Sequence, residues 1–363
     1  MTRRMSYGSV LVSGLMVAGL AGAATAQEAE DELVVLCTPQ EQWCVRMVEE
    51  FQSQTGIPTS YVRMSSGESL ARLRAASEDP EFDVWWGGPA DGQIAANEEG
   101  LLENYVPPNA EFVADEQKDA DGVWTGVYVG ALGLCVNEKV IEEIGAEMPE
   151  TWDDLLDPVF ESNIAMAHPA SSGTAYTTFY TQVLRLGSEE AAMEYAKALH
   201  PNILQYTKSG SASGPMAGRG EIAVSIIFSH DCIKNIEEGY SDLAVVFPAD
   251  GTGYEIGAEA LVANAPHPNN AKAWMDWALR ADVQEIGPEV GSFQLPTNVN
   301  AAVSDKAVKL SEVDLVEYEW EAAGGAGRRV CGGWGGGVGG APGVWRGPGA
   351  GGPGALGVRG GAA

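Results

Sequence analysis

Two serine- and glycine-rich stretches, far apart in the sequence, have the composition of anion-binding helix starts. Ser65-Ser66-Gly67 precedes one run with helical periodicity, and Ser171-Ser172-Gly173-Thr174 precedes another. The first turn of a helix presents unpaired backbone N–H groups and the positive end of the helix dipole, which can hold an anion without a lysine or arginine. Simple N-capping is the alternative for each stretch, because it also favours serine and threonine. Since the pattern occurs twice, we predict one anion held from two sides.

The segments around the first serine pair alternate between strand-like and helix-like patterns. Strands are expected over 33–36, 59–62 and 82–86, with helices over 42–54 and after Ser65. Such βαβαβ units form parallel sheets that bind ligands at the carboxyl ends of their strands. The loops after the three strands should therefore converge on one wall of a cleft. Besides the serine pair, these loops contain Gln40 and Trp86. Stacking of Trp86 on a ligand is one interpretation, and packing inside the protein is the other.

A long strand-prone stretch, residues 124–136, is expected to cross into a second lobe, and residues 253–263 should cross back. The predicted architecture is α/β, with two lobes, each a mixed sheet flanked by helices, and a ligand cleft between them. The predicted boundaries are 27–130 and 252–300 for lobe 1, 131–251 for lobe 2, and 301–322 for a segment packed on the lobes.

The second lobe contains further candidates for ligand contact. Three of the four histidines precede a proline, which turn geometry explains, and only His230 lacks that explanation. It follows a buried run and stands beside Asp231, so it either contacts a ligand or is a satisfied core histidine. Asp231 has capping of the next helix as its alternative role. Ser209 begins a Ser/Gly-rich loop that is either a further phosphate contact or an ordinary linker, and Arg219 is close enough in sequence to add charge, with a solvated surface position as its alternative.

The charge and the N-terminus restrict the partners and the compartment. The formal net charge of the chain is −30, which excludes nucleic acid and anionic membrane surfaces as expected partners. Residues 1–26 have the pattern of an export signal: Arg3 and Arg4, an apolar run over 10–21, and a small-residue cleavage site at Ala24-Thr25-Ala26. We therefore expect a soluble mature protein outside the cytoplasm, with an uncleaved anchor as the alternative; the family resemblance given below implies the periplasm.

Cysteine usage agrees with export. Cys37 and Cys44 would join the first strand to the next helix, and Cys135 and Cys232 would be left to pair with each other. Buried free thiols are the alternative, above all for the second pair. Cysteine and histidine spacing does not match a metal site, so no metal and no cofactor are expected.

Several stretches together resemble the ferric and sugar-phosphate-type solute-binding proteins of bacterial ABC importers, which have the type II periplasmic fold. The residues that carry the resemblance over roughly 31–320 are Leu33-Val-Val-Leu-Cys-Thr-Pro-Gln-Glu, Phe82-Asp-Val-Trp-Trp-Gly-Gly-Pro, Pro149-Glu-Thr-Trp-Asp-Asp-Leu-Leu, Ala167-His-Pro-Ala-Ser-Ser-Gly-Thr and Gly291-Ser-Phe-Gln-Leu-Pro-Thr-Asn. The resemblance implies capture of a small ligand between two lobes and its delivery to an ABC permease, without a chemical reaction. A monomer is expected.

The resemblance also bears on the ligand. Ferric members resemble one another in an adjacent tyrosine pair, which this chain lacks. Members that bind hexose phosphates are similar to this sequence in a His-Asp pair, here His230-Asp231, and in a glutamate on the returning strand, where Glu255 fits. A hexose phosphate is therefore the predicted ligand. A phosphonate such as 2-aminoethylphosphonate, whose ammonium the acids would bind, is the alternative, followed by ferric iron.

An exported serine hydrolase is the alternative of another class. Adjacent residues point in different directions, so Asp231 is poorly placed to orient His230, and the chain has no G-x-S-x-G motif. From Gly324 onward the sequence is rich in glycine and has no acidic residue. We interpret residues 323–363 as a disordered or frameshifted tail, with a functional flexible tail as the alternative.

Overall fold

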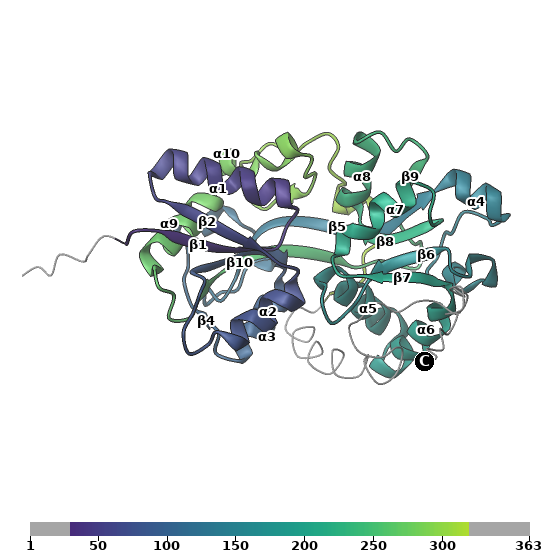
Figure 1. Cartoon of the computed structure of the whole chain (residues 1–363), viewed down its shortest axis with the longest axis horizontal. Coiled ribbons are helices and arrows are strands. Elements are labelled where there is room, and N and C mark those ends of the chain that lie inside the picture. The colour runs from purple at the N-terminus through teal and green to yellow at the C-terminus, as the bar shows by residue number, and fades with distance from the viewer. Residues whose placement is uncertain (1–29, 319–363) are drawn as a thin grey trace, which may run out of the picture. The chain divides into compact units, whose positions relative to one another are not determined.

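Strand β5 (Thr125–Asn137) connects the fold, because its two halves belong to different groups of strands. The computed structural model describes residues 30–318. The first half of β5 pairs with β10 (Tyr254–Val262), and the second half pairs with β8 (Val224–Phe228) and β9 (Leu243–Val246). We call the part built around the first half lobe 1 and the part around the second half lobe 2 (Figure 1). Both lobes lie within the unit that begins at Asp31.

Lobe 1 has parallel strands at one side and antiparallel strands at the other. The order is β2-β1-β3-β10-β5, in which β1 is parallel to both β2 and β3, and β10 is antiparallel to β3. Besides β5 and β10, the strands of lobe 1 are β1 (Leu33–Cys37), β2 (Thr59–Arg63), β3 (Val84–Pro89), β4 (Leu102–Glu103) and β11 (Leu295–Pro296). The third strand begins at Val84 and ends at Pro89, whereas 82–86 was predicted. Its pairing with β10 is interrupted at Gly87 and Gly88, both with positive φ, and resumes at Pro89.

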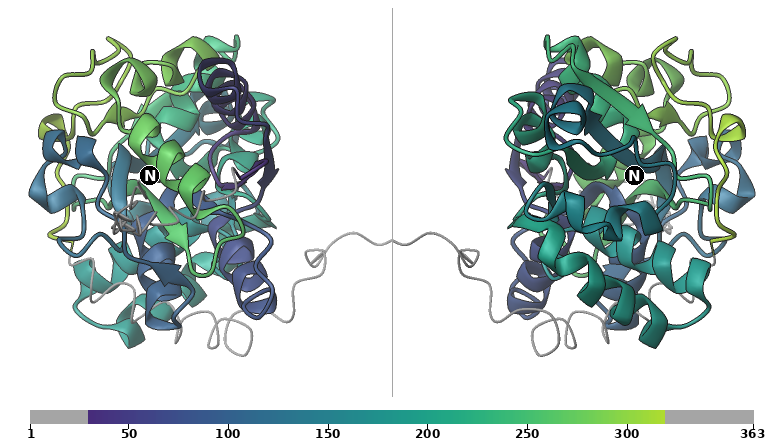
Figure 2. Two further views of the ribbon diagram at one scale, coloured as in Figure 1. Left: turned by 90° about the vertical axis from the view of Figure 1, so that its left-hand side faces the viewer. Right: turned by 90° about the vertical axis from the view of Figure 1, so that its right-hand side faces the viewer.

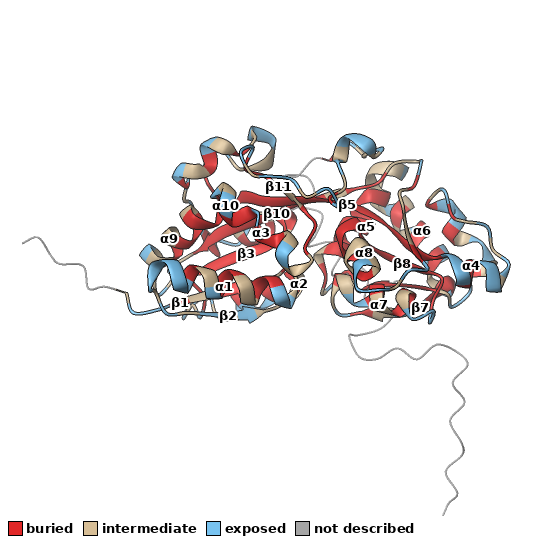
Figure 3. Ribbon diagram, turned by 90° about the horizontal axis from the view of Figure 1, so that it is seen from above, coloured by how far each residue is buried: buried red, intermediate tan, exposed pale blue. Residues whose placement is uncertain are grey.

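Helices cover both faces of the lobe 1 sheet. Its helices are α1 (Glu41–Thr55), α2 (Ser66–Ala75), α3 (Ala90–Glu98), α9 (Pro268–Ala278) and α10 (Ala281–Gln284). One core joins side chains of α1 and α9 to one face, and a second core joins those of α2 and α3 to the other. The inner strands β3 and β10 are accordingly buried, whereas the edge strand β2 and the outer sides of the helices are partly exposed (Figure 3).

Lobe 2 repeats this layering with the strand order β5-β8-β6-β7, in which β6 (Ile164–Ala167) is parallel to β7 (Ile203–Thr207) and to β8. Its helices are α4 (Glu138–Ile144), α5 (Gly173–Leu186), α6 (Glu189–Leu199), α7 (Gly214–Gly218) and α8 (Ser229–Glu237). Views from the two ends show helices on both sides of the strands (Figure 2). The predicted Ser/Gly-rich loop after Ser209 is in fact a short 3₁₀ helix (Gly210–Ser213) that leads into α7.

The segment after β11 returns to the junction of the lobes. Leu315 bridges to Thr252 just before β10, and the ring of Tyr318 packs on Tyr180 and Tyr254. The Tyr318 hydroxyl donates to Asp91 Oδ2 at 3.2 Å. The predicted signal, residues 1–26, and the predicted tail, residues 323–363, lie outside the described residues.

Two disulfides join elements of the fold. Cys37 and Cys44 link β1 to α1, and Cys135 and Cys232 link β5 to α8. Between residues 30 and 318, no helix has the length and apolar character needed to cross a membrane.

Candidate functional site

An open cavity lies where the loops after β1, β2 and β3 meet the starts of α5 and α8. The cavity is at the carboxyl ends of the parallel strands of lobe 1, as expected for this kind of sheet. The predicted site residues that line it are Gln40, Ser65, Ser66, Ser172, Gly173, Thr174, Ser209, His230, Asp231 and Glu255.

Three residues named from the sequence do not line the cavity. Gly67 N–H donates to Ser171 O at 3.1 Å, so this pair joins the two lobes directly. A side chain at Gly67 would clash, because its Cβ would lie 2.5 Å from the carbonyl oxygen of Ala170. Trp86 lies in the core of lobe 1, where its ring packs edge-on against Trp43, with the ring centroids 5.1 Å apart. Of the two interpretations of Trp86, the structure therefore supports packing rather than ligand stacking.

Hydroxyl groups gather on one side of the cavity, around the starts of α2 and α5. Glu68 accepts a hydrogen bond from Ser65 N at 3.4 Å, and Ser172 Oγ accepts one from Ala175 N at 3.5 Å, so both serines also have capping roles. The hydroxyl of Ser66 is buried and has no hydrogen-bond partner among the described residues. Gly173 keeps this side tight, because a Cβ there would lie 2.7 Å from Ser66 Oγ. This group can donate hydrogen bonds to an anion.

Arg63, the last residue of β2, also lines the cavity on the hydroxyl side. Its guanidinium donates to Pro39 O at 3.0 Å and to Ser209 Oγ at 3.2 Å, which joins the lobes. The two helix starts are therefore accompanied by a cation that the sequence analysis did not name. The rule that ligands meet strand ends could have identified Arg63, because it follows directly from the predicted strand over 59–62. Arg219 instead pairs with Glu221 at the surface.

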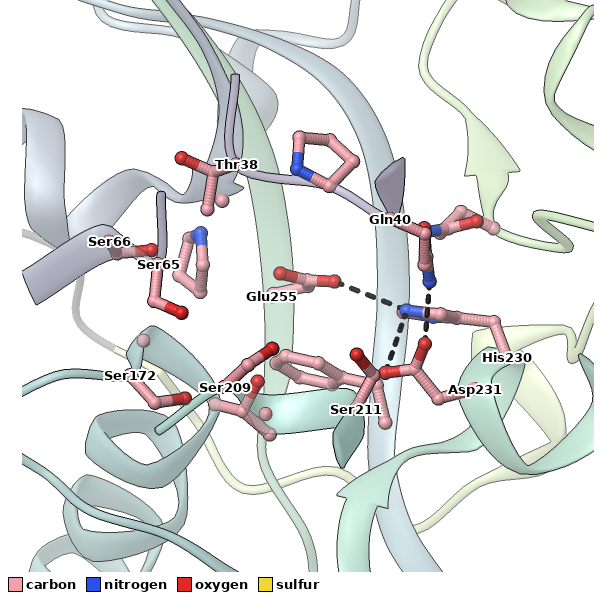
Figure 4. Close-up of a pocket in the computed structure, with 18 of the residues that line it drawn as sticks. Thr38, Gln40, Ser65, Ser66, Ser172, Ser209, Ser211, His230, Asp231 and Glu255 are labelled. Atoms are coloured by element: carbon pink, nitrogen blue, oxygen red, sulfur yellow. Dashed lines mark hydrogen bonds and ion pairs between the residues drawn. The ribbon is translucent and has the colours of Figure 1, made fainter. Parts of the chain in front are cut away.

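Ionisable groups occupy the other side of the cavity. His230 Nε2 is 3.7 Å from Glu255 Oε1 and 3.9 Å from Asp231 Oδ2, and all three side chains are buried. Burial raises the pKa of Glu255 well above its ordinary value, and the nearby charges of Asp231 and Asp91 add to this. Burial also lowers the pKa of His230, which keeps the ring neutral. Figure 4 shows Ser65, Ser66 and Ser172 on one side, His230 and Asp231 on the other, and Glu255 between them.

Two lining residues, Tyr128 and Gln294, were not predicted as contacts. The Tyr128 oxygen accepts from Gly88 N at 2.8 Å. Tyr128 lies within the predicted crossing strand, but the side to which it points depends on the register of β5 and β10. Gln294 belongs to the motif Gly291-Ser-Phe-Gln, and its Oε1 is buried without a partner in the described part of the chain. The same holds for His230 Nδ1.

The donor set of the cavity does not form a metal centre. Among residues 30–318 no group of three or more His, Cys, Asp or Glu side chains is arranged to hold a metal ion.

Comparison with known proteins gives consistent matches. A family model described as bacterial extracellular solute-binding protein matches residues 93–319. An uncharacterized protein of Haemophilus influenzae is 35% identical over 318 residues, which cover 86% of this chain and 91% of that protein.

Two solved structures are similar in both sequence and fold. The periplasmic binding protein AfuA from Actinobacillus pleuropneumoniae, with fructose-6-phosphate bound, is 36% identical, with a TM-score of 0.82 over 85% of this chain and 98% of that one. The periplasmic binding protein P5PA is 34% identical, with a TM-score of 0.82 over 85% of this chain and all (100%) of that one. The predicted fold class and family resemblance are thereby confirmed.

Proposed function

This chain belongs to the family of bacterial extracellular solute-binding proteins, and we propose that the solute it captures is a phosphorylated sugar. It is a substrate-binding protein of the kind that serves ABC transporters, and the expectation that it is not an enzyme is confirmed by the family.

The observation that supports this ligand most strongly is the difference between the two sides of the cavity. The hydroxyl side combines the starts of α2 and α5 with Arg63, which is a suitable environment for phosphate oxygens. The other side presents Asp231, Glu255 and a neutral His230, which can accept from and donate to sugar hydroxyls. A ligand with a phosphate at one end and hydroxyls at the other satisfies both sides at once.

Buried unpaired polar atoms on both sides support the same proposal. Ser66 Oγ lies on the hydroxyl side, and His230 Nδ1 lies on the other, each without a partner within the described residues. Leaving such groups unpaired costs roughly 1–3 kcal/mol each, which a polar ligand can recover. AfuA, which is similar to this chain, has fructose-6-phosphate bound in its structure. We therefore propose fructose 6-phosphate or a related hexose phosphate as the ligand.

The compartment and the partner complete the proposal. The similar proteins AfuA and P5PA are periplasmic binding proteins, and residues 1–26 have the pattern of an export signal. We propose that the chain is exported to the periplasm, binds its ligand as a monomer and delivers it to an ABC permease in the inner membrane. The net charge of −30 means that the bound phosphate is held by local donors against an unfavourable overall field.

Calorimetric titration of the ligand-stripped protein tests the ligand class. We expect fructose 6-phosphate and glucose 6-phosphate to bind, and we expect 2-aminoethylphosphonate and ferric citrate to bind at least about a hundredfold more weakly. Preference for the phosphonate would show that Asp231 and Glu255 bind an ammonium, and preference for ferric citrate would show an iron carrier. Either result would leave the family assignment unchanged and would overturn the proposed ligand.

A further inference from the structure

Like Arg63, the side chain of Gln40 reaches from lobe 1 across the cavity to lobe 2. Gln40 Nε2 donates to Asp231 Oδ1 at 2.5 Å, and Figure 4 shows this contact beside His230. The bond uses one carboxylate oxygen of Asp231. The other oxygen, Oδ2, is the one that lies 3.9 Å from His230 Nε2. The orientation of Gln40 therefore determines which oxygen of Asp231 is available to a ligand hydroxyl.

The side chain of Gln40 is oriented by Ser292, a residue that does not line the cavity. Ser292 is only 1% exposed, and its hydroxyl donates to Gln40 Oε1 at 3.1 Å. Its main chain is fixed as well, because its N–H donates to Gly287 O at 2.9 Å. The two ends of an amide differ, since the oxygen only accepts and the nitrogen only donates. A donor at Oε1 therefore turns the Nε2 group toward the Asp231 carboxylate.

The main chain of Gln40 is held by the disulfide between Cys37 and Cys44. Cys37 ends β1 and Cys44 lies in the first turn of α1, so the bond closes the loop that contains Gln40. The start of this loop has other anchors, since Trp85 Nε1 donates to Thr38 Oγ1 at 2.8 Å. The main-chain oxygen of Gln40 accepts only from the start of α1, at Trp43 N and Cys44 N, among the backbone contacts of the described residues. The disulfide ties that helix start to β1.

We propose that Ser292 and the Cys37–Cys44 disulfide are positioning groups for ligand capture, which act by holding Gln40 on Asp231 so that Asp231 offers one defined oxygen to a hydroxyl of the ligand. The proposal rests on the proposed function, because it assigns a role in binding the sugar end of the ligand. It adds residues outside the cavity to the set that determines affinity.

The positioning itself can be measured on the full-length protein without a ligand. Nuclear magnetic resonance of the side-chain amide of Gln40, assigned by its loss in Gln40→Ala, reports on the bond to Asp231. We expect its shift to change and its hydrogen exchange to speed up in Ser292→Ala and in Cys37→Ser/Cys44→Ser. Ser304→Ala is the matched control, because the Ser304 hydroxyl accepts from Lys306 N, two residues away, and has no contact with Gln40 among the described hydrogen bonds. An unchanged Gln40 signal in both test variants would overturn the proposal, even if no sugar phosphate binds.

The effect on binding is tested by double-mutant cycles with fructose 6-phosphate. We expect Ser292→Ala and the double cysteine variant each to weaken binding about fivefold, as for the loss of one hydrogen bond. In the Gln40→Ala background the same changes should have almost no effect, because their influence passes through Gln40. Equal losses in both backgrounds would show a general structural role and contradict the proposal. Failure of the unaltered protein to bind any sugar phosphate would refute the proposed function and the part of this inference that concerns the sugar, while the amide measurement would still decide the positioning.

Discussion

The two sides of the cavity offer different kinds of polar group to a ligand. The hydroxyl side is made of helix starts, hydroxyls and the guanidinium of Arg63. The carboxylate side contains Asp231 and Glu255, and burial raises the pKa of Glu255 well above its ordinary value. One side therefore fits a charged group and the other fits neutral hydroxyls. The ligand class that we propose therefore depends on the difference between the two sides and not on either side alone.

Removal of Arg63 should lower the affinity for the ligand more than any other change to the two sides of the cavity. Arg63→Met deletes the cation that lines the hydroxyl side, and we expect affinity for a sugar phosphate to fall about a hundredfold, as for loss of a charged hydrogen bond. Calorimetric titration measures the change. Lys208→Met is the matched control, because Lys208 pairs with Glu68 and is largely exposed. A loss of similar size in the control would mean that the effect is one of general charge.

Neutralising Asp231 should have the next largest effect. Asp231→Asn keeps the shape of the side chain but weakens its capacity to accept from Gln40 and from a ligand hydroxyl, so we expect about a tenfold loss of affinity for the sugar phosphate. The affinity for inorganic phosphate should stay the same, since phosphate belongs on the other side. The exposed Asp242→Asn serves as control. Parallel losses for both ligands would refute the division of the cavity.

Asp91 is a buried carboxyl group whose charge acts on Glu255. Its raised pKa leads us to expect that stability depends on pH. Burial raises the pKa of Asp91 to about 7, and its Oδ2 accepts from the Tyr318 hydroxyl. Between pH of about 4 and 7 the unfolded chain loses this proton while the folded chain keeps it, so stability falls as pH rises. Glu255, whose pKa is also raised, adds to the fall. Thermal unfolding should therefore show a lower Tm at pH 7.5 than at pH 5, and Asp91→Asn should reduce this difference. An unaltered pH dependence in the variant would contradict the assignment.

Trp86 should matter to neither side of the cavity. Its ring lies in the aromatic core of lobe 1 between Trp43 and Trp274, so Trp86→Phe should lower stability by about 1–3 kcal/mol through poorer packing. Ligand affinity should change less than about twofold. Chemical denaturation and calorimetry measure the two quantities separately. A large loss of affinity with unchanged stability would restore the stacking interpretation.

Sequence patterns predicted the loops of the cavity better than the side chains that face it. Ser65, Ser172 and Ser209 could be named because helix starts and glycine-rich loops leave a local signal in the sequence. Trp86 could not be assigned to core or cavity, because both uses place an aromatic residue at a strand end. Tyr128 was missed because its direction depends on pairing with β10, at a point where the register shifts. Such long-range register has no local signature.

The lobes themselves were predictable from periodicity, since strands such as β1 are buried and helices such as α1 bury one face. Arg63 shows the limit of reasoning by residue type alone. The predicted anion donors were serines, whereas Arg63 is marked by its position at the end of a predicted strand. Ser292 shows a different limit, because it contributes only through contact with Gln40, far away in the sequence.

The central claim is that one ligand must satisfy both sides of the cavity, and one calorimetric comparison tests it most directly. The ligand-stripped protein is titrated with fructose 6-phosphate, and its affinity is compared with those for fructose and for inorganic phosphate. We expect fructose 6-phosphate to bind at least about a thousandfold more tightly than fructose or inorganic phosphate, because only the whole molecule pairs the groups on both sides. Binding of phosphate or fructose as tight as that of fructose 6-phosphate would contradict the account.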